Sequence, residues 1–241
     1  MTHVLVPVAI LEGGTVSTGL VDLLSTMDVT VLGYHVLPEQ TPPDQARAQF
    51  EDRANDALAD LTEEFRSAGG EAYHRLVFTQ DRQQSIDRVA AETNARAHAI
   101  TGTTGAVDSL LVSLTGDIDV DRITDFVVEL LGDRPIAVTL FASDGSVAGD
   151  EGADGRLATA TDRLSAAGIE TTTRVAAGKP LDALVDAVAG HDAIVMGERA
   201  PSLSSLLFGE EADRVAAASV GPVLVVRASP DGTDDEPEET R

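Results

Sequence analysis

The sequence predicts an α/β protein made of two similar units, each with a parallel sheet covered by helices on both faces. The runs VLVPV, AIVM and PVLVV are continuously apolar, as expected of parallel strands buried on both sides. These runs alternate with helical segments over short loops, which favours a parallel sheet. The segments HVLVPV at 3–8 and SLLVSL at 109–114 open stretches of the same plan, which indicates an internal repeat.

The first copy contains strands and helices in strict alternation. In chain order they are a strand at 3–8, a helix at 15–27, a strand at 28–37, a long helix at 42–69, a strand from 75, an amphipathic helix, and a short apolar strand that ends at Gly102. The long helix has apolar residues at helical spacing on one face, namely Ala46, Phe50, Ala54, Ala57, Leu58, Leu61 and Phe65. Pro42 and Pro43 suit its first turn, and Gly69 suits its end.

The second copy repeats this order and then continues further. Its predicted elements are a strand at 109–114, a helix at 119–133, a strand at 134–143, a helix at 153–168, and a strand, a helix and an apolar strand that ends at Gly197. It then adds a helix from Glu210 to Ala218 and a last strand from Pro222 to Arg227. The first copy lacks both, because TTGAVD leads directly from Gly102 into the second copy. We therefore expect a truncated first domain at 1–105, whose exposed sheet edge needs cover, a complete domain at 107–228, and a disordered acidic tail at 229–241.

Composition excludes several classes of function. The chain has 41 acidic and 17 basic residues and a net charge of −24, which disfavours nucleic acid and anionic membranes as partners. This acidic, lysine-poor composition resembles that of proteins from salt-loving archaea, where concentrated salt screens self-repulsion. The absence of cysteine excludes disulfides, and the five scattered histidines have no metal-ligand spacing. No apolar stretch approaches the ~20 residues of a membrane span, and the first residues lack the basic region of a secretory signal, so we expect a cytoplasmic protein.

Four segments resemble the universal stress protein (UspA-like) superfamily, in a tandem form of haloarchaeal type. They are HVLVPV, VTVLGYHVLPE, RVAAGKPLDALVDAVA and DAIVMGERAPSLSSLLFGEEADRVAAASVGPVLVVR. The resemblance implies a Rossmann-like sheet, of the adenine nucleotide alpha hydrolase-like type, with strand order 3-2-1-4-5. It also implies a dimer and, in one subclass, an ATP site.

That ATP-binding subclass has a glycine after the fourth strand, a second glycine three residues later, nine intervening residues, and then Gly-Ser or Gly-Thr. Such glycines let backbone amides approach phosphates. Here Gly197 and Gly209 match, whereas Ala200 replaces the second glycine, the spacing is shorter, and Glu210 replaces the hydroxyl residue. The family's nucleotide binders also carry an aspartate after the first strand, where this chain has Ala9 and Thr115. A carboxylate about 4 Å from a phosphate is unfavourable by ~4 kcal/mol at an effective dielectric of 20. The ATP loop is therefore interpreted as degraded.

We therefore expect a non-catalytic binding or regulatory protein of stress response, without a cofactor and with a possible protein partner. The alternative is an ATP- or AMP-binding sensor that uses the modified loop at Gly197 and Gly209. A third reading, an enzyme of the wider Rossmann-like group, lacks a recognisable catalytic cluster. The terminal strand would be an exposed edge in a monomer. The resemblance therefore predicts a homodimer through Val223, Leu224, Val225 and Val226, although the internal duplication could substitute for part of that interface.

Overall fold

The structure is a computed structural model. It describes residues 2–38, 42–115, 118–143, 152–177, 180–198 and 221–228. The predicted helix from Glu210 to Ala218 and the predicted tail at 229–241 lie outside these residues.

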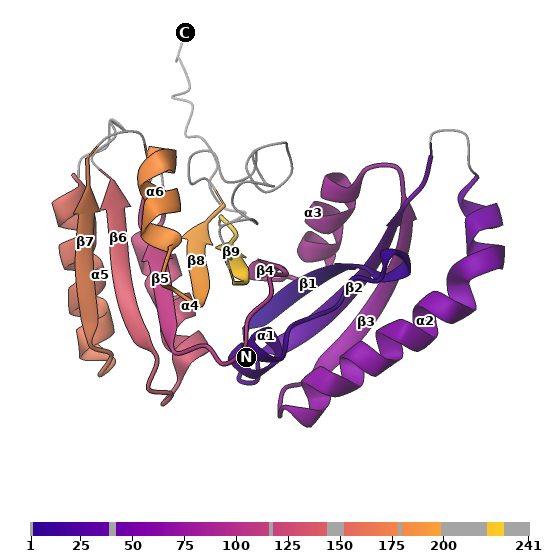
Figure 1. Cartoon of the computed structure of the whole chain (residues 1–241), viewed down its shortest axis with the longest axis horizontal. Coiled ribbons are helices and arrows are strands. Elements are labelled where there is room, and N and C mark those ends of the chain that lie inside the picture. The colour runs from indigo at the N-terminus through magenta and orange to yellow at the C-terminus, as the bar shows by residue number, and fades with distance from the viewer. Residues whose placement is uncertain are drawn as a thin grey trace, which may run out of the picture.

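A single nine-stranded sheet runs through the whole described chain (Figure 1), in the order β3-β2-β1-β4-β9-β8-β5-β6-β7. The second half, read from β7 to β9, has the predicted order 3-2-1-4-5, and the first half has its first four positions. Every neighbouring pair of strands is parallel except β4 and β9, which are antiparallel. The predicted α/β fold with a mostly parallel sheet is therefore confirmed.

The elements of the first half follow the predicted alternation. They are β1 (His3–Ala9), the short 3-10 helix η1 (Ile10–Glu12), α1 (Thr18–Leu23), β2 (Asp28–Val36), α2 (Pro43–Ser67), β3 (Ala72–Thr79), α3 (Arg82–Glu92) and β4 (Ala97–Ile100). Helix α1 is shorter than the predicted helix at 15–27. Ser17 precedes it in an extended conformation, and the Ser17 side chain accepts a hydrogen bond from the Leu20 backbone N–H, which fixes the start of the helix.

The second half repeats the same order. Its elements are β5 (Ser109–Ser113), α4 (Val120–Leu131), β6 (Ala137–Ser143), α5 (Ala153–Ala166), β7 (Thr171–Ala176), α6 (Pro180–Val188), β8 (Ala193–Gly197) and β9 (Val223–Val226). The Asp119 carboxylate accepts a hydrogen bond from the Arg122 backbone N–H and caps the start of α4. The predicted division into domains at 1–105 and 107–228 stays a prediction, because one sheet passes through both.

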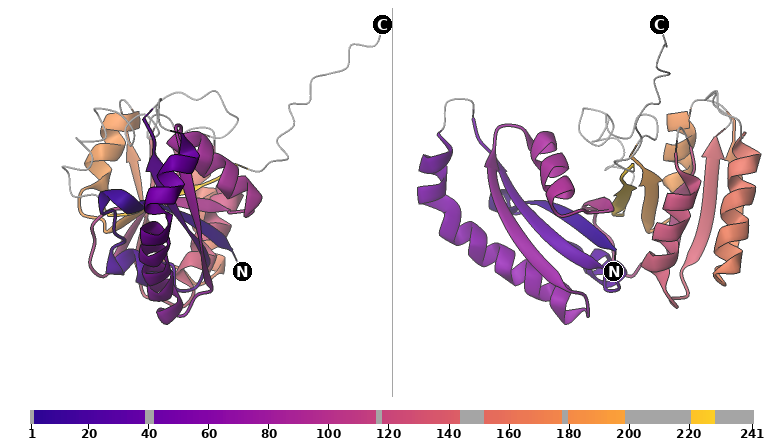
Figure 2. Two further views of the ribbon diagram at one scale, coloured as in Figure 1. Left: turned by 90° about the vertical axis from the view of Figure 1, so that its right-hand side faces the viewer. Right: turned by 180° about the vertical axis from the view of Figure 1, so that it is seen from behind.

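Helices cover both faces of this sheet. On one face, side chains of α1, α2, α4 and α5 share a core that includes Leu20 and Leu58 of the first half and Phe126 and Leu157 of the second. On the opposite face, α3 packs on β1 and β2 through one cluster, and α6 packs on β5, β6 and β8 through another. The right-hand view in Figure 2 shows α2 and α5 at opposite ends of the molecule. A core that contains residues of both halves couples their folding.

Strand β9 joins the two halves. It pairs in parallel with β8, and its other edge pairs antiparallel with β4, so that His98 lies opposite Val225. The expectation that Val223–Val226 forms a free edge in the monomer is therefore wrong. The edge of β9 is taken by β4, because the first half has no fifth strand of its own in the described residues. The predicted cover of the first half by the second half is therefore present. A homodimer through β9 would require β4 to leave.

Arg134 also links the halves, through the carboxyl ends of two helices. Its Nη1 donates to Asp22 O at 2.6 Å and its Nη2 to Leu23 O at 2.8 Å, both at the end of α1. The same guanidinium donates to Leu130 O and to Leu131 O at the end of α4. Burial lowers the pKa of Arg134. One cation therefore neutralises the partial negative charge at both helix ends.

Candidate functional site

The candidate site lies at the carboxyl ends of β5, β6 and β8. Strand β5 pairs with β6 on one side and with β8 on the other. The order of strands therefore reverses at β5, and ligands of open α/β sheets bind outside the carboxyl ends of the strands at such a point.

Three hydroxyl groups lie together at this edge. Ser113 ends β5, Thr115 follows it, and Ser143 ends β6. Ser113 pairs with Phe141, and the Leu114 N–H donates to Phe141 O, which carries the pairing past the end of β5. Thr115 therefore lies level with Ser143. Because side chains alternate along a strand, all three hydroxyls are on the face that α6 covers.

These hydroxyls are buried and lack hydrogen-bond partners. Ser113, Thr115 and Ser143 are 0%, 3% and 2% exposed, and in the described part of the chain none of their oxygens has a partner. A buried hydroxyl without a partner costs about 1–3 kcal/mol, so three at one edge call for an explanation. A polar ligand group that entered this edge would satisfy them. Sequence analysis alone did not identify Ser113 and Ser143 as site residues. The signal that could have identified them is a polar residue at the end of an apolar strand.

Gly197 is at this edge as predicted, but its small size serves packing. A Cβ at Gly197 would lie 2.9 Å from Ile118 Cγ2 and 3.4 Å from Ile123 Cδ1, on the side of α4. The hydroxyls are on the opposite face of the sheet. The structure therefore explains Gly197 without a phosphate. Gly209, Ala200 and Glu210 lie outside the described residues, so the predicted loop from Gly197 to Gly209 stays a prediction.

The carboxylates near this edge are engaged by backbone groups. The Glu198 carboxylate accepts a hydrogen bond from the Ala228 N–H at 2.9 Å, and the Glu198 N–H donates to Val226 O. Asp119 caps α4. The Glu198 contacts hold the ends of β8 and β9 together, and the Asp119 contact holds the start of α4. Both carboxylates therefore have structural roles.

The corresponding edge of the first half is closed by the chain itself. A Cβ at Gly19, in α1, would lie 1.7 Å from Gly105 O and 2.7 Å from Thr104 Cγ2. The segment that follows β4 therefore packs directly against α1. His98 in β4 is buried, and this burial lowers its pKa, opposed mainly by Glu198 and Asp87. His35 makes edge-on contacts with Phe50 and Phe78, which place it among packed aromatic side chains.

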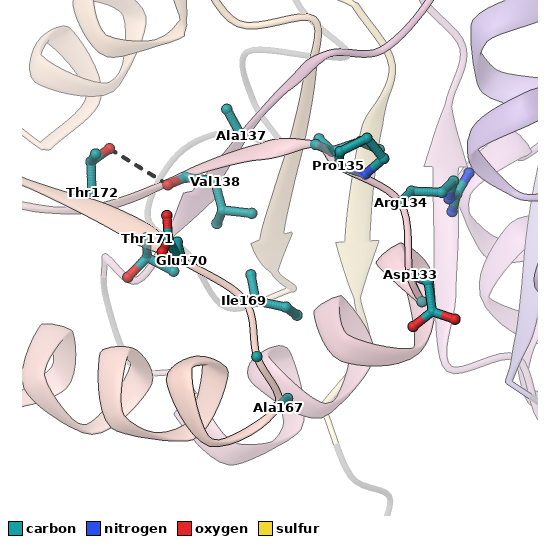
Figure 3. Close-up of a pocket in the computed structure, with 13 residues that line it drawn as sticks. Asp133, Arg134, Pro135, Ala137, Val138, Ala167, Ile169, Glu170, Thr171 and Thr172 are labelled. Atoms are coloured by element: carbon teal, nitrogen blue, oxygen red, sulfur yellow. Dashed lines mark hydrogen bonds between the residues drawn. The ribbon is translucent and has the colours of Figure 1, made fainter.

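A hollow lies at the end of the second half opposite to the hydroxyl-lined edge (Figure 3). It has a volume of about 660 Å³ and is lined by residues 132–138 and 167–172. Ile169 and Thr171 belong to its wall, and Thr172 Oγ1 donates to Val138 O at 3.5 Å. Arg134 also lines it, but the contacts described above already use its guanidinium.

Within the described ranges, His, Asp and Glu side chains form no group of three that could hold a metal ion. No helix in those ranges is long and apolar enough to span a bilayer.

Comparisons with known proteins agree with the fold. Residues 128–227 match the universal stress protein family. The structure is similar to a universal stress protein from Archaeoglobus fulgidus DSM 4304, with a TM-score of 0.64 and 17% identity over 95% of this chain and 97% of that one. It is also similar to the cytoplasmic domain of a prokaryotic cation chloride cotransporter, with a TM-score of 0.51 and 10% identity over 93% of this chain and 94% of that one. No curated protein matches the sequence significantly. The family match at 128–227 supports a relationship to the universal stress protein superfamily, and the similar structures support the fold.

Proposed function

We propose that this chain, which carries a universal stress protein family domain at 128–227, is a non-catalytic binding and regulatory protein of stress response. Its tandem form would be of haloarchaeal type, and it would act in the cytoplasm through a protein partner. The net charge of −24 supports a protein adapted to concentrated salt, in which such self-repulsion is screened.

The observation that carries the non-catalytic proposal is the chemistry of the candidate site. General acid–base catalysis requires a titratable side chain within hydrogen-bond reach of the reacting group. Within the described residues, the side chains at the carboxyl ends of β5 and β6 on this face carry hydroxyls, and the Arg156 guanidinium donates to Leu114 O at 3.0 Å. The carboxylates of Glu198 and Asp119 are engaged by backbone N–H groups. Of the described residues with shifted pKa values, Asp192 precedes β8 at the other end of that strand. His98 is in β4, which β9 and β8 separate from β5.

The second candidate is an ATP- or AMP-binding sensor, and the three buried hydroxyls favour it. A hydroxyl can both donate and accept, so Ser113, Thr115 and Ser143 could bind a ribose or a base edge at the switch point. Against this candidate stand Ala200 and Glu210 in the sequence of the loop.

Titration with a fluorescent ATP analogue and Mg²⁺ in molar KCl, with AMP and adenosine as competitors, tests the proposal. The non-catalytic proposal predicts neither saturable micromolar binding nor phosphate release from ATP. Saturable micromolar binding that Thr115→Val weakens at least about tenfold, or about 1.4 kcal/mol, would favour the sensor instead. Thr139→Val is the matched control, because Thr139 is in the same sheet but in the amino-terminal half of β6. Gly197→Val is a poor test because it would collide with Ile118.

The Thr115→Val variant also tests the site without ligand. It replaces a buried, unpartnered hydroxyl by a methyl group of similar shape, so we expect an increase of about 1 kcal/mol in the free energy of unfolding. A loss of stability in the ligand-free protein would show that the hydroxyl has a hydrogen-bond partner in solution.

A further inference from the structure

Strand β7 forms one outer edge of the nine-stranded sheet, at the far left in Figure 1. None of its six residues is buried, and Val175 is 45% exposed, which makes it one of three large apolar side chains exposed in the described part of the chain. The strand contains no proline or lysine and one charged residue, Arg174. Proteins normally protect such edges from pairing with another chain.

The sequence around this edge is complementary to itself when reversed. Residues 169–175 read IETTTRV. Residues at equal distances on either side of Thr172 are therefore complementary, being two threonines, two opposite charges and two apolar residues. Thr171 corresponds to Thr173, Glu170 to Arg174, and Ile169 to Val175. In an antiparallel pair of identical strands centred on Thr172, each of these residues would lie directly opposite its counterpart in the other copy.

The charged side chains of this edge are available for such a pair. Within the described ranges, Glu170 and Arg174 make no side-chain hydrogen bond or ion pair. At the other outer strand, β3, Glu71 immediately precedes the strand and Arg75 lies within it, at the same spacing. Both side chains are engaged within the chain. Arg75 Nη1 lies 2.5 Å from Glu92 Oε2, and Glu71 accepts a hydrogen bond from the Tyr73 hydroxyl at 2.9 Å.

We propose that β7 is an interface for a second copy of this chain, formed by antiparallel pairing of the two β7 strands about a twofold axis at Thr172. Such an isologous contact closes as a dimer. Two Glu170–Arg174 pairs and two Ile169–Val175 pairs form across it, and Thr172 lies opposite Thr172. Ile169 is part of the wall of the hollow in Figure 3, so each Val175 packs beside that hollow in the other copy.

The twofold symmetry and the charges select this register. A twofold axis perpendicular to the sheet keeps corresponding faces of the two copies on the same side. Residues that lie directly opposite each other must then have side chains on the same face, which requires the axis to pass at a residue position. An axis at Arg174 would oppose two arginines, which is destabilising. An axis at Thr173 would place Arg174 opposite Thr172 and leave Glu170 opposite Ala176. The axis at Thr172 alone among these matches both charges and both apolar residues.

Charge reversal tests this interface on the full chain. The mass of the wild type is measured by light scattering and sedimentation over a range of micromolar concentrations in about 0.3 M KCl, which leaves exposed pairs partly unscreened. We expect a dimer in the wild type. Glu170→Arg alone and Arg174→Glu alone place like charges opposite each other twice, and we expect each to weaken the dimer by about tenfold or more. Because both side chains are at the surface, circular dichroism should show unchanged folding.

Two further samples make the result specific. The double variant Glu170→Arg/Arg174→Glu restores both pairs and should restore the dimer. An equimolar mixture of the two single variants also opposes unlike charges and should associate, although each variant alone does not. Arg75→Glu on β3 is the matched control and should leave association unchanged. A monomeric wild type, single variants that associate as the wild type does, or a mixture that remains monomeric would overturn the proposal.

Discussion

Replacing Arg134 by methionine should destabilise the whole chain, because this side chain joins the two halves. Methionine retains much of the aliphatic volume but removes every donor. The lost contacts are those to Asp22 O and Leu23 O in α1 and to Leu130 O and Leu131 O in α4.

The expected loss follows from two terms. A cation near a helix carboxyl end contributes about 0.3–1 kcal/mol, and Arg134 serves two such ends. Hydrogen bonds to a charged group contribute about 1.5–3 kcal/mol each when buried. Because Arg134 is only partly buried and the freed carbonyls can bind water, we discount this second term to about 1–2 kcal/mol in total. The free energy of unfolding should therefore fall by about 2–4 kcal/mol.

Urea unfolding at fixed KCl, followed by circular dichroism, measures this change. Arg88→Met is the matched control, because the Arg88 side chain is 57% exposed and its nearest carboxylate, Glu92, is 4.0 Å away. It should change stability by less than about 0.5 kcal/mol. A loss below about 1 kcal/mol for Arg134→Met, or equal losses for both variants, would refute the assignment of Arg134 as the link between α1 and α4.

Three further predictions concern packing, pH and salt. Gly19→Ala should destabilise strongly, by about 2 kcal/mol or more, because its Cβ would meet Gly105 O at 1.7 Å; thermal unfolding at fixed KCl should show a lower Tm, and an unchanged Tm would contradict the contact. The Ser109 hydroxyl and the backbone N–H groups of Asp108 and Ser109 lower the pKa of Asp192. The stabilisation from the ionised Asp192 carboxylate is therefore present above about pH 4 and lost as the pH falls further. The loss of stability in Asp192→Ala, measured by urea unfolding, should thus disappear in acid. A loss that does not depend on pH would refute the carboxylate as its origin. Raising KCl should raise the midpoint of urea unfolding, because salt screens a net charge of −24; a midpoint that is insensitive to salt would contradict the proposed adaptation.

The sequence predicted the elements well because their signals are local. The helix at 42–69 was observed as α2 at Pro43–Ser67, since its apolar spacing and its prolines act within the same segment. The helix at 15–27 was predicted too long because Ser17, which caps α1, reads as an ordinary polar residue until its neighbours are placed. The pairing of β4 with β9 joins residues far apart in the sequence, and no local pattern specifies it.

The candidate site was harder to predict than the fold for a related reason. The sequence drew attention to Gly197, yet Ile118 and Ile123 explain that glycine by packing. The hydroxyls of Ser113 and Ser143 gain their meaning from the register of β5 and β6, which places side chains 30 residues apart at one edge. Burial without a partner is a property of the assembled sheet, so a single strand cannot reveal it.

The four-stranded first half determines which surfaces of the described chain remain available for binding. Because that half lacks a fifth strand, β4 takes the free edge of β9, and the segment after β4 packs against α1 at Gly19. The edge of β9 and the corresponding site of the first half are thereby both used within one chain. In the described part of the chain, the hydroxyl-lined edge of the second half and the two outer strands, β3 and β7, are not used in this way. Arg66 Nε donates to Ala72 O on β3, so it is β7, with its unengaged charges, that can accept a partner without breaking an existing contact.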